Sequence, residues 1–472
     1  QIRMYLIIGM GQTGRSLAAY LHKAGCDFVA IDTRLDATRD QHWADQYGFD
    51  SVAVWPENRK MRQALLARAE NGVMLSPGVN PQEKSVAELL AEARAAGIAI
   101  RGDLDLFFTV STRPRVLITG SNGKSTVALW ISELLKALGY RVALGGNYGT
   151  PALDLLSQPA DVDVLEVSSF QLATTAHISS NAAVVLNISP DHLDRHGDMQ
   201  TYAELKLKLL AHSECALINQ DDDLCSQYAL ANSGCCAFSL RDQTAFAHIA
   251  VKDGQDWLVV NGQPVITAAS LSVCGEHNLA NGLATLALLA GFAGRDALKR
   301  PEVLEAFRRF SGLEHRMELV DEHLYAGVVC RFINDSKATN VGATQAALSG
   351  LNGPVGIILG GVAKDQDFSS LAGMVASRKA EVGLVGDQNA ELKEALKREQ
   401  VGFIECEHRN ELGTLLARLT TKVIAQAHKT NAEHAYLLFS PACASFDWYE
   451  HYQQRGTAFK MSVLELDQKE IG

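Results

Sequence analysis

The stretch "VLITGSNGKST", residues 116–126, decides the fold of this chain. It reads as a buried strand, a glycine turn and the start of a helix, which is the layout of a phosphate-binding loop. The common pattern G-x-x-x-x-G-K-[ST] requires glycine at position 118, but Ile118 stands there. The sequence therefore predicts a shorter phosphate loop of the form Gly-x-x-Gly-Lys-Ser.

The chemistry of this loop can be argued without the full pattern. Gly120 and Gly123 let backbone N–H groups approach phosphate oxygens, and the helix expected over 124–138 points its positive end at the anion. Lys124 supplies a positive charge, and Ser125 or the following threonine can place a hydroxyl on Mg²⁺. The alternative is a glycine turn with a chance Gly-Lys-Ser. Because strand, turn and helix agree, a nucleotide site is favoured.

Composition places the chain among soluble globular proteins of several domains. It has 472 residues, of which 47% are hydrophobic and 21% charged, and its net charge is −11. The acidic balance argues against a nonspecific nucleic-acid binder. Nine cysteines without a C-x-x-C pair fit reduced thiols in a cytoplasm better than a disulfide framework. No apolar run is long enough to suggest membrane insertion.

Short strands alternate with helices along most of the chain, which predicts an α/β fold with parallel β-α-β units. Three units follow one another. We expect a Rossmann-like domain over 1–110, a central P-loop ATPase-like domain over 111–312 and a second Rossmann-like domain over 313–472. Within the central domain, 237–272 reads as short strands that form a small antiparallel appendage. Ligands bind at the carboxyl ends of parallel strands, and most polar clusters of this sequence lie there.

A second glycine motif, "GMGQTG" at 9–14, follows the first strand. With Asp32 at the end of the next strand, it has the layout of a dinucleotide-binding fingerprint. Such a match is weak on its own, because any diphosphate can use the same glycines and helix N-terminus. Thr33 and Arg34 offer a hydroxyl and a guanidinium where the ribose end of a ligand would lie. A structural glycine turn is the alternative.

Several further residues are candidates only by their place at strand ends or helix starts. Glu166 ends an apolar strand, where its carboxylate can bind Mg²⁺ or remain a solvated acid. His192 follows the next strand, and Lys206 lies in a helix in which Lys208 is equally plausible from its chemistry. Asn278 and the asparagine three residues later share one helix face, where such residues are often mere caps.

A set of motifs in fixed order carries a family resemblance. "ITGSNGKST", "GGNYGTPAL", "LEVSSFQL", "NISPDHLDRHG", "EHNLANGLA", "GLEHRME", "NDSKATN" and "SPACASFDWYEHYQQRG" resemble the Mur ligase family over nearly the whole chain. "NDSKATN" and the C-terminal motif are similar to its D-glutamate-adding branch in particular. The family has the short phosphate loop, so the absence of glycine at position 118 agrees with the resemblance.

The resemblance implies an ATP-dependent amide ligase of peptidoglycan precursor synthesis. The carboxylate of UDP-N-acetylmuramoyl-L-alanine would attack the γ-phosphoryl group, and the amine of D-glutamate would attack the resulting acyl phosphate. ATP, two Mg²⁺ ions and a carbamylated lysine would assist. We expect a cytoplasmic monomer with no nucleic-acid partner.

The resemblance also assigns site residues. The ATP-binding set is Gly120, Ser121, Asn122, Gly123, Lys124, Ser125, Thr126, Asn278, Asn281, Arg316, Asp335 and Lys337. Metal ligands would be Ser125, Glu166, His192 and carbamylated Lys206, and the catalytic set is Lys124, His192 and Lys206. The UDP-substrate set is Gln12, Thr13, Thr33, Arg34, Ser76, Gly78, Asn147 and His192. The D-glutamate set is Thr339, Lys364, Ser445 and Tyr452.

Two departures from the family pattern bear on the amino-acid pocket. Tyr452 stands where phenylalanine is frequent, so its hydroxyl needs a partner. The stretch "GGVAKDQDF", 360–368, differs from the commoner acidic form, although Lys364 keeps its place.

Two other functions stay open. One is a different amino-acid ligase of the same family, or one that adds glutamate to folate. The other is an NAD-dependent oxidoreductase with an incidental phosphate loop, which would use the fingerprint at 9–14.

Overall fold

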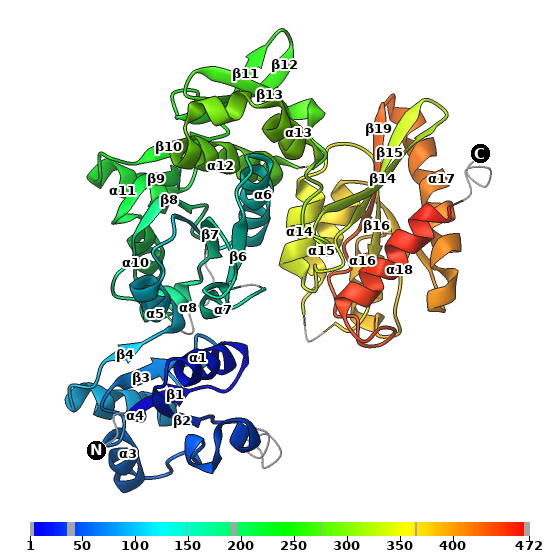
Figure 1. Cartoon of the computed structure of the whole chain (residues 1–472). Helices are drawn as coiled ribbons and strands as arrows, with labels where there is room; N and C mark the ends of the chain where they lie inside the picture. Colours follow the sequence, from blue (N-terminus) through cyan, green and yellow to red (C-terminus); the bar gives the residue numbers. More distant parts are fainter. Residues whose placement is uncertain are drawn as a thin grey trace. The chain divides into compact units, whose positions relative to one another are not determined.

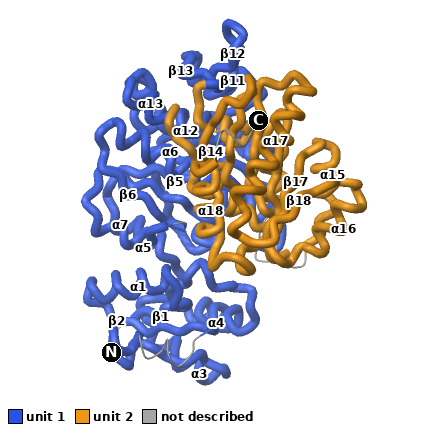
Figure 2. Tube along the Cα trace, turned by 90° about the vertical axis from the view of Figure 1, so that its right-hand side faces the viewer, with its two compact units in different colours: residues 1–269, 280–307 blue, residues 270–279, 308–472 orange. Residues whose placement is uncertain are grey.

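The computed structural model describes residues 4–34, 43–147, 149–189, 196–273, 275–363 and 366–466. The described chain contains three β-sheets with helices between their strands, as the alternation in the sequence predicts (Figure 1). It divides into two compact units (Figure 2). The first unit comprises 1–269 and 280–307, and the second comprises 270–279 and 308–472.

The N-terminal sheet is parallel and has the strand order β2-β1-β3-β4. Its strands are short apolar runs whose residues are largely buried, which is typical of a sheet covered on both faces. They are β1 (Met4–Ile8), β2 (Asp27–Ile31), β3 (Gly72–Leu75) and β4 (Ile100–Arg101). The helices are α1 (Gln12–Lys23), α3 (Arg59–Leu66), α4 (Lys84–Ala95) and α5 (Asp103–Val110), with a short 3-10 turn at Phe49–Ser51.

The second sheet has nine strands in the order β13-β12-β11-β10-β9-β8-β5-β7-β6. The strands are β5 (Arg115–Thr119), β6 (Val142–Gly146), β7 (Val162–Glu166), β8 (Ser180–Val185), β9 (Ser213–Asn219), β10 (Cys236–Ser239), β11 (Ala247–Lys252), β12 (Gln255–Val260) and β13 (Gln263–Thr267). Pairing is parallel from β6 to β11 and antiparallel for β12 and β13. The antiparallel strands expected within 237–272 are therefore present, and they continue the edge of this sheet.

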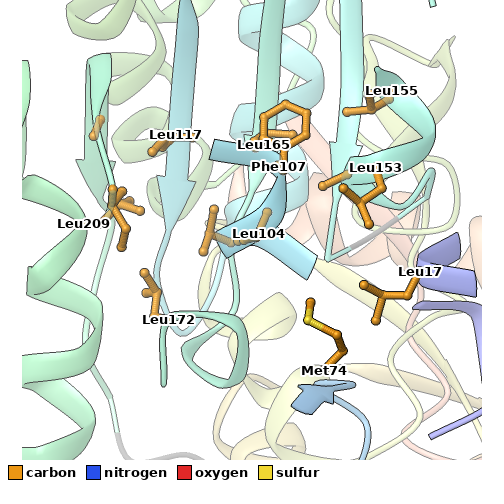
Figure 3. Packing of buried hydrophobic residues seen from close by; sticks show 14 of the residues in the cluster. Leu17, Met74, Leu104, Phe107, Leu117, Leu153, Leu155, Leu165, Leu172 and Leu209 are labelled. Atoms are coloured by element: carbon orange, nitrogen blue, oxygen red, sulfur yellow. The ribbon is translucent and has the colours of Figure 1, made fainter. Parts of the chain in front are cut away.

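The helices of the nine-stranded region follow its strands. They are α6 (Lys124–Ala137), α7 (Ala152–Leu155), α8 (Ser169–Ala173), α10 (Met199–Leu207), α11 (Asp223–Ala231), α12 (Glu276–Ala293) and α13 (Pro301–Arg309). Short 3-10 turns lie at Lys208–Leu210, Ala268–Ser270 and Arg295–Lys299. One apolar cluster joins this region to the N-terminal sheet. In Figure 3, Leu17 and Met74 lie near Leu104 of α5 and Leu153 of α7.

The third sheet has the order β14-β15-β19-β16-β17-β18, and only β14 pairs antiparallel. Its strands are β14 (Glu318–Tyr325), β15 (Val328–Asn334), β16 (Val355–Leu359), β17 (Glu381–Leu384), β18 (Phe403–Glu405) and β19 (His434–Phe439). Its helices are α14 (Val341–Ser349), α15 (Ser369–Ser377), α16 (Ala390–Arg398), α17 (Leu412–Thr430) and α18 (Tyr452–Leu464), with a 3-10 turn at Arg409–Glu411. Two apolar clusters pack against this sheet.

Candidate functional site

The phosphate loop connects β5 to α6, and β5 lies between β8 and β7 in the nine-stranded sheet. Gly123 has φ 86° and directly precedes the helix, a conformation that costs glycine little. A Cβ atom on Gly123 would lie 2.6 Å from Oδ1 of Asn281, so the asparagine side chain would have to shift if residue 123 carried a side chain. The predicted strand, turn and helix are therefore present, and the turn is closed by a residue of α12.

Two lysines meet at one carbonyl of this loop. Nζ of Lys124 donates to the Gly120 oxygen at 2.8 Å, and Nζ of Lys206 donates to the same oxygen at 3.0 Å. Lys206 is 2% exposed. It comes from α10, so the fold brings it to the phosphate loop from far along the chain.

The structure separates Lys206 from its neighbour Lys208, which the sequence alone leaves equally plausible. Nζ of Lys208 donates to the carbonyl oxygens of Leu172 and Thr175, at the end of α8. Burial lowers the pKa of Lys208. Lys208 therefore caps a helix, and Lys206 is the lysine that lies at the loop.

A buried carboxylate lies beside the first turn of α6. Oε2 of Glu166 accepts a hydrogen bond from the Ser125 hydroxyl at 2.6 Å, and Oε1 accepts one from Nδ2 of Asn147 at 3.3 Å. Glu166 ends β7 and Asn147 follows β6, and both strands lie next to one another in the sheet. Because parallel strands end at one edge, these three predicted residues converge there.

Sequence reasoning missed other residues that hold the loop. Oδ1 of Asn187 accepts from the Asn122 N–H at 2.8 Å, and its Nδ2 donates to the Asn122 oxygen at 3.0 Å. The Tyr202 hydroxyl lies 3.0 Å from Oγ of Ser121. Asn187 directly follows Leu186 after β8, so its place at a strand end is the signal that could have found it.

The asparagines of α12 both lie among buried residues. Asn278 is 5% exposed and Asn281 is 7% exposed. Their spacing puts them on one face of the helix, as predicted. Asn281 contacts the phosphate loop at Gly123, and Asn278 belongs to the second compact unit.

The N-terminal glycine loop is closely packed. A Cβ atom on Gly14 would overlap the Gly9 oxygen, and Ser76 donates from Oγ to that oxygen at 3.2 Å. Both oxygens of Asp32 are engaged, since Oδ2 accepts from the Met10 N–H and Oδ1 from the Arg34 N–H, each at 2.8 Å. Burial opposes ionisation of Asp32, but these bonds leave its pKa below the usual value. Asp32 thus supports the glycine loop through both of its oxygens.

The remaining residues predicted for the UDP-substrate surround this loop. Thr33 and the Arg34 side chain are exposed, and Ser76 is buried. Gly78 follows β3. Nε2 of Gln12 donates to the Gly149 oxygen at 3.2 Å. These residues lie in the first compact unit, together with the phosphate loop.

The second compact unit holds another cluster of predicted residues, at the ends of β15 and β19. Asp335 is 6% exposed, and it accepts from Oγ of Ser440 at 2.7 Å and from the Met317 N–H at 3.1 Å. Burial raises its pKa to about 7, against the lowering effect of these bonds and of Arg316. Arg316 therefore lies beside a carboxyl group that is held at the strand end.

The predicted D-glutamate residues lie in the same unit. Nζ of Lys337 lies 5.8 Å from the centre of the Tyr452 ring, and the Tyr452 oxygen of the main chain accepts from Ser336 at 2.8 Å. Ser445 is buried and Thr339 is half-buried. Thr339 follows β15 and Ser445 follows β19, and these two strands pair in parallel.

Two predicted residues, His192 and Lys364, lie outside the described residues. Within the described ranges, no group of three or more His, Cys, Asp or Glu side chains could hold a metal ion. The same ranges contain no helix that is long and apolar enough to cross a membrane.

Comparisons with known proteins identify the family of this chain. A model of the Mur ligase middle domain matches residues 118–289, and a model of the MurD-like N-terminal domain matches residues 3–102. The UDP-N-acetylmuramoylalanine–D-glutamate ligase of Hahella chejuensis is 38% identical, with 98% of each chain covered. That of Methylococcus capsulatus is 37% identical, with 98% of this chain and 94% of the relative covered.

A solved structure shows the same fold. The UDP-N-acetylmuramate–alanine ligase MurC of Thermotoga maritima has a TM-score of 0.55 at 16% identity, with 98% of this chain and 100% of the other covered. The fold and the phosphate site thus define an ATP-dependent ligase, and the chain belongs to the Mur ligase family. Its full-length similarity places it with the UDP-N-acetylmuramoylalanine–D-glutamate ligases (MurD) of that family. Nothing in the comparisons supports the oxidoreductase alternative.

Proposed function

We propose that this chain adds D-glutamate to UDP-N-acetylmuramoyl-L-alanine, with ATP as the energy source, in peptidoglycan precursor synthesis in the cytoplasm. The observation that carries the proposal is the convergence of Lys124 and Lys206 on one carbonyl of the phosphate loop, in a chain similar over its full length to ligases of this name. A carboxylate is a poor electrophile, and transfer of the γ-phosphoryl group gives it a leaving group.

We assign ATP to the phosphate loop, 120–126. The glycines let backbone N–H groups reach the phosphates, and the N-terminus of α6 favours negative charge there. Lys124 balances charge on the transferring phosphoryl group. Asn281 already contacts the loop, while Asn278, Arg316, Asp335 and Lys337 would contribute from the second compact unit.

The donor set beside the loop suits Mg²⁺. Mg²⁺ prefers hard oxygen ligands, and the Ser125 hydroxyl and Glu166 carboxylate are 2.6 Å apart in a buried position. We propose that two Mg²⁺ ions are held by Ser125, Glu166, His192 and a modified Lys206. Bound there, Mg²⁺ would neutralise negative charge that develops on the phosphoryl oxygens.

Lys206 is the residue for which modification has the clearest physical reason. Two ammonium groups that share the Gly120 oxygen repel one another, and Lys206 is buried. A carbamate on Nζ would replace one of the two cations by an anion that offers oxygen ligands.

We assign the UDP end of the nucleotide-sugar substrate to the N-terminus of α1. The glycine loop and helix N-terminus suit a diphosphate, and Thr13, Thr33, Arg34, Ser76 and Gly78 lie around the same strand ends. By its likeness to the family motif, we assign Asn147 to the muramoyl group; its amide donates to Glu166. The hydrogen bond from Gln12 to Gly149 joins the two regions.

D-glutamate needs cations and hydroxyls for two carboxylates. We assign it to Thr339, Ser445, Tyr452 and Lys364.

We also propose that the chain has three functional domains, over 1–110, 111–312 and 313–472, and that it is a monomer.

The test is amino-acid-dependent release of phosphate. The protein is mixed with ATP, Mg²⁺ and UDP-N-acetylmuramoyl-L-alanine, together with D-glutamate, L-alanine or diaminopimelate in separate reactions. Release of phosphate with D-glutamate and formation of the corresponding amide support the proposal. Release only with another amino acid would assign the chain to a different branch of the family, and no release at all would refute the ligase function for this substrate.

A further inference from the structure

The turn "GLEHRME", 312–318, has an unusual backbone around Arg316. The residues on either side of Arg316 are His315 with φ 65° and Met317 with φ 42°. Neither is glycine, so each left-handed conformation costs about 1 kcal/mol or more and requires support from its surroundings. Two unfavourable backbone conformations flank Arg316. They suggest that the direction in which the Arg316 side chain leaves the backbone matters for function.

Glu318 provides the support. It is the first residue of β14, and its Oε2 accepts from the His315 N–H at 2.9 Å and from Nδ2 of Asn334 at 3.0 Å. Its Oε1 accepts from Nζ of Lys460 at 3.1 Å. The carboxylate thus ties the strained turn to the end of β15 and to α18, with only 16% of its side chain exposed.

The same turn is fixed at two further points. The Met317 N–H donates to Oδ1 of Asp335 at 3.1 Å, and the Lys337 N–H donates to the His315 oxygen at 3.0 Å. The His315 ring lies against α18, where a Cβ atom on Gly456 would overlap Nδ1 of the ring. Asp335, Lys337 and α18 thus each contact the turn and favour the backbone conformation that it adopts.

We propose that Glu318 is a positioning residue for the ligation, which holds the turn 314–317 so that Arg316 is presented to the nucleotide. This inference rests on the proposed function, through the assignment of Arg316 to ATP. Glu318 is hydrogen-bonded to His315, Asn334 and Lys460. It acts through the backbone on either side of Arg316.

Glu318→Gln tests the proposal. Its amide has one acceptor oxygen, while the His315 N–H, the Asn334 amide and Lys460 all donate to Glu318, so at least one bond is lost. We expect the KM for ATP to rise about tenfold, as for loss of a hydrogen bond to a charged group. The KM values for the UDP-substrate and D-glutamate should change little. An unchanged KM for ATP would overturn the proposal.

Glu314→Gln is the matched control. Glu314 also pairs with Lys460, at 2.7 Å, and its Oε1 lies 3.7 Å from Nε2 of His315, but it is 64% exposed and, among the described residues, its side chain accepts from no backbone N–H of the turn. This variant should retain the KM for ATP. An equal rise in both variants would mean that the charge around Lys460 matters rather than the turn, and would overturn the proposal.

A double variant separates positioning from general stability. If Glu318 acts through Arg316, Glu318→Gln adds little to the rise in KM for ATP that Arg316→Ala already causes, because the two effects are not independent. Independent effects would multiply, and that result contradicts the proposal. Glu318→Asp keeps the charge and serves if Glu318→Gln does not fold; it should also raise the KM for ATP, and an unchanged value would contradict the proposal.

Binding of a non-hydrolysable ATP analogue, measured by calorimetry on the same variants, keeps the inference separate from the proposed function. A wild-type protein that forms no amide with D-glutamate would refute the function. The analogue would still report on the turn, since weaker binding to Glu318→Gln than to Glu314→Gln supports the inference and equal binding overturns it.

Discussion

At the scale of the residue, the phosphate loop is characterised by the side chains that are hydrogen-bonded to it. Lys124 and Lys206 share the Gly120 oxygen, whereas Lys208 binds the last carbonyls of α8. Lys206 and Lys208 are only two positions apart, but their side chains point in different directions from the helix and therefore have different partners.

We expect Lys206→Ala to lower the ligation rate about a hundredfold or more, as for loss of a group that stabilises charge in the site, and added bicarbonate should not restore it. Lys208→Ala is the matched control. It should reduce the free energy of unfolding by about 1–3 kcal/mol, because carbonyls at the end of α8 lose their donor, and leave the rate nearly unchanged. A fully active Lys206→Ala protein would contradict the role of Lys206.

Asp335 predicts a dependence of stability on pH. Burial raises its pKa to about 7 in the folded chain, above the usual value of about 4 in an unfolded one. The folded state therefore binds the proton more tightly, and this contribution to stability is present at low pH and is lost as the pH rises through 7.

Urea unfolding of the wild type and of Asp335→Asn at about pH 5 and about pH 8 measures this effect. The amide in the variant cannot ionise, so the wild type should lose stability relative to the variant between the two values. A constant difference between the two proteins would show that Asp335 keeps an ordinary pKa.

At the scale of the element, the carboxyl ends of neighbouring strands bring the site together. Glu166 from β7, Asn147 after β6 and Asn187 after β8 all meet at the loop that follows β5 or at its partners. Helix α12 closes the loop, because Asn281 packs against the bare Cα of Gly123.

Gly123→Ala tests this packing against Gly139→Ala. Both glycines have positive φ, 86° and 92°, so each substitution costs about 1 kcal/mol of backbone strain. Only Gly123 has a close neighbour, at 2.6 Å, while a Cβ atom on Gly139 meets open space. Calorimetry should therefore find that affinity for an ATP analogue falls about tenfold or more in Gly123→Ala alone. Equal losses would mean that the contact with Asn281 is unimportant.

A feature of the structure could be predicted from the sequence where the residues that form it are adjacent in the chain. The strand, turn and helix of the phosphate loop could be predicted, because their pattern lies within adjacent residues. The bond between Ser121 and Tyr202 joins residues 81 positions apart, and that between Asn122 and Asn187 joins residues 65 apart. No spacing in the sequence encodes these partners, so the position of Asn187 just after a strand could indicate a site residue but not its bond to Asn122.

A similar limit applies to Asp32 and Glu318. The sequence places Asp32 at the end of a strand in a fingerprint layout, but its two oxygens accept from the backbone N–H groups of Met10 and Arg34. Glu318 lies within the motif "GLEHRME", but two of its partners lie on β15 and α18, and no spacing in the sequence indicates them. The fold class followed from alternation alone, since β-α-β units are repeated along the whole chain.

At the scale of the whole molecule, the described chain divides into two compact units, of which the first holds the phosphate loop and the second holds Arg316.

The central claim is that the substrate carboxylate is phosphorylated by ATP before the amide forms. UDP-N-acetylmuramoyl-L-alanine that carries ¹⁸O in its alanine carboxylate is converted with ATP, Mg²⁺ and D-glutamate, and the released phosphate is analysed by mass spectrometry. We expect one ¹⁸O atom to appear in the phosphate for each amide formed. Amide formation with unlabelled phosphate, or no amide at all, would contradict it.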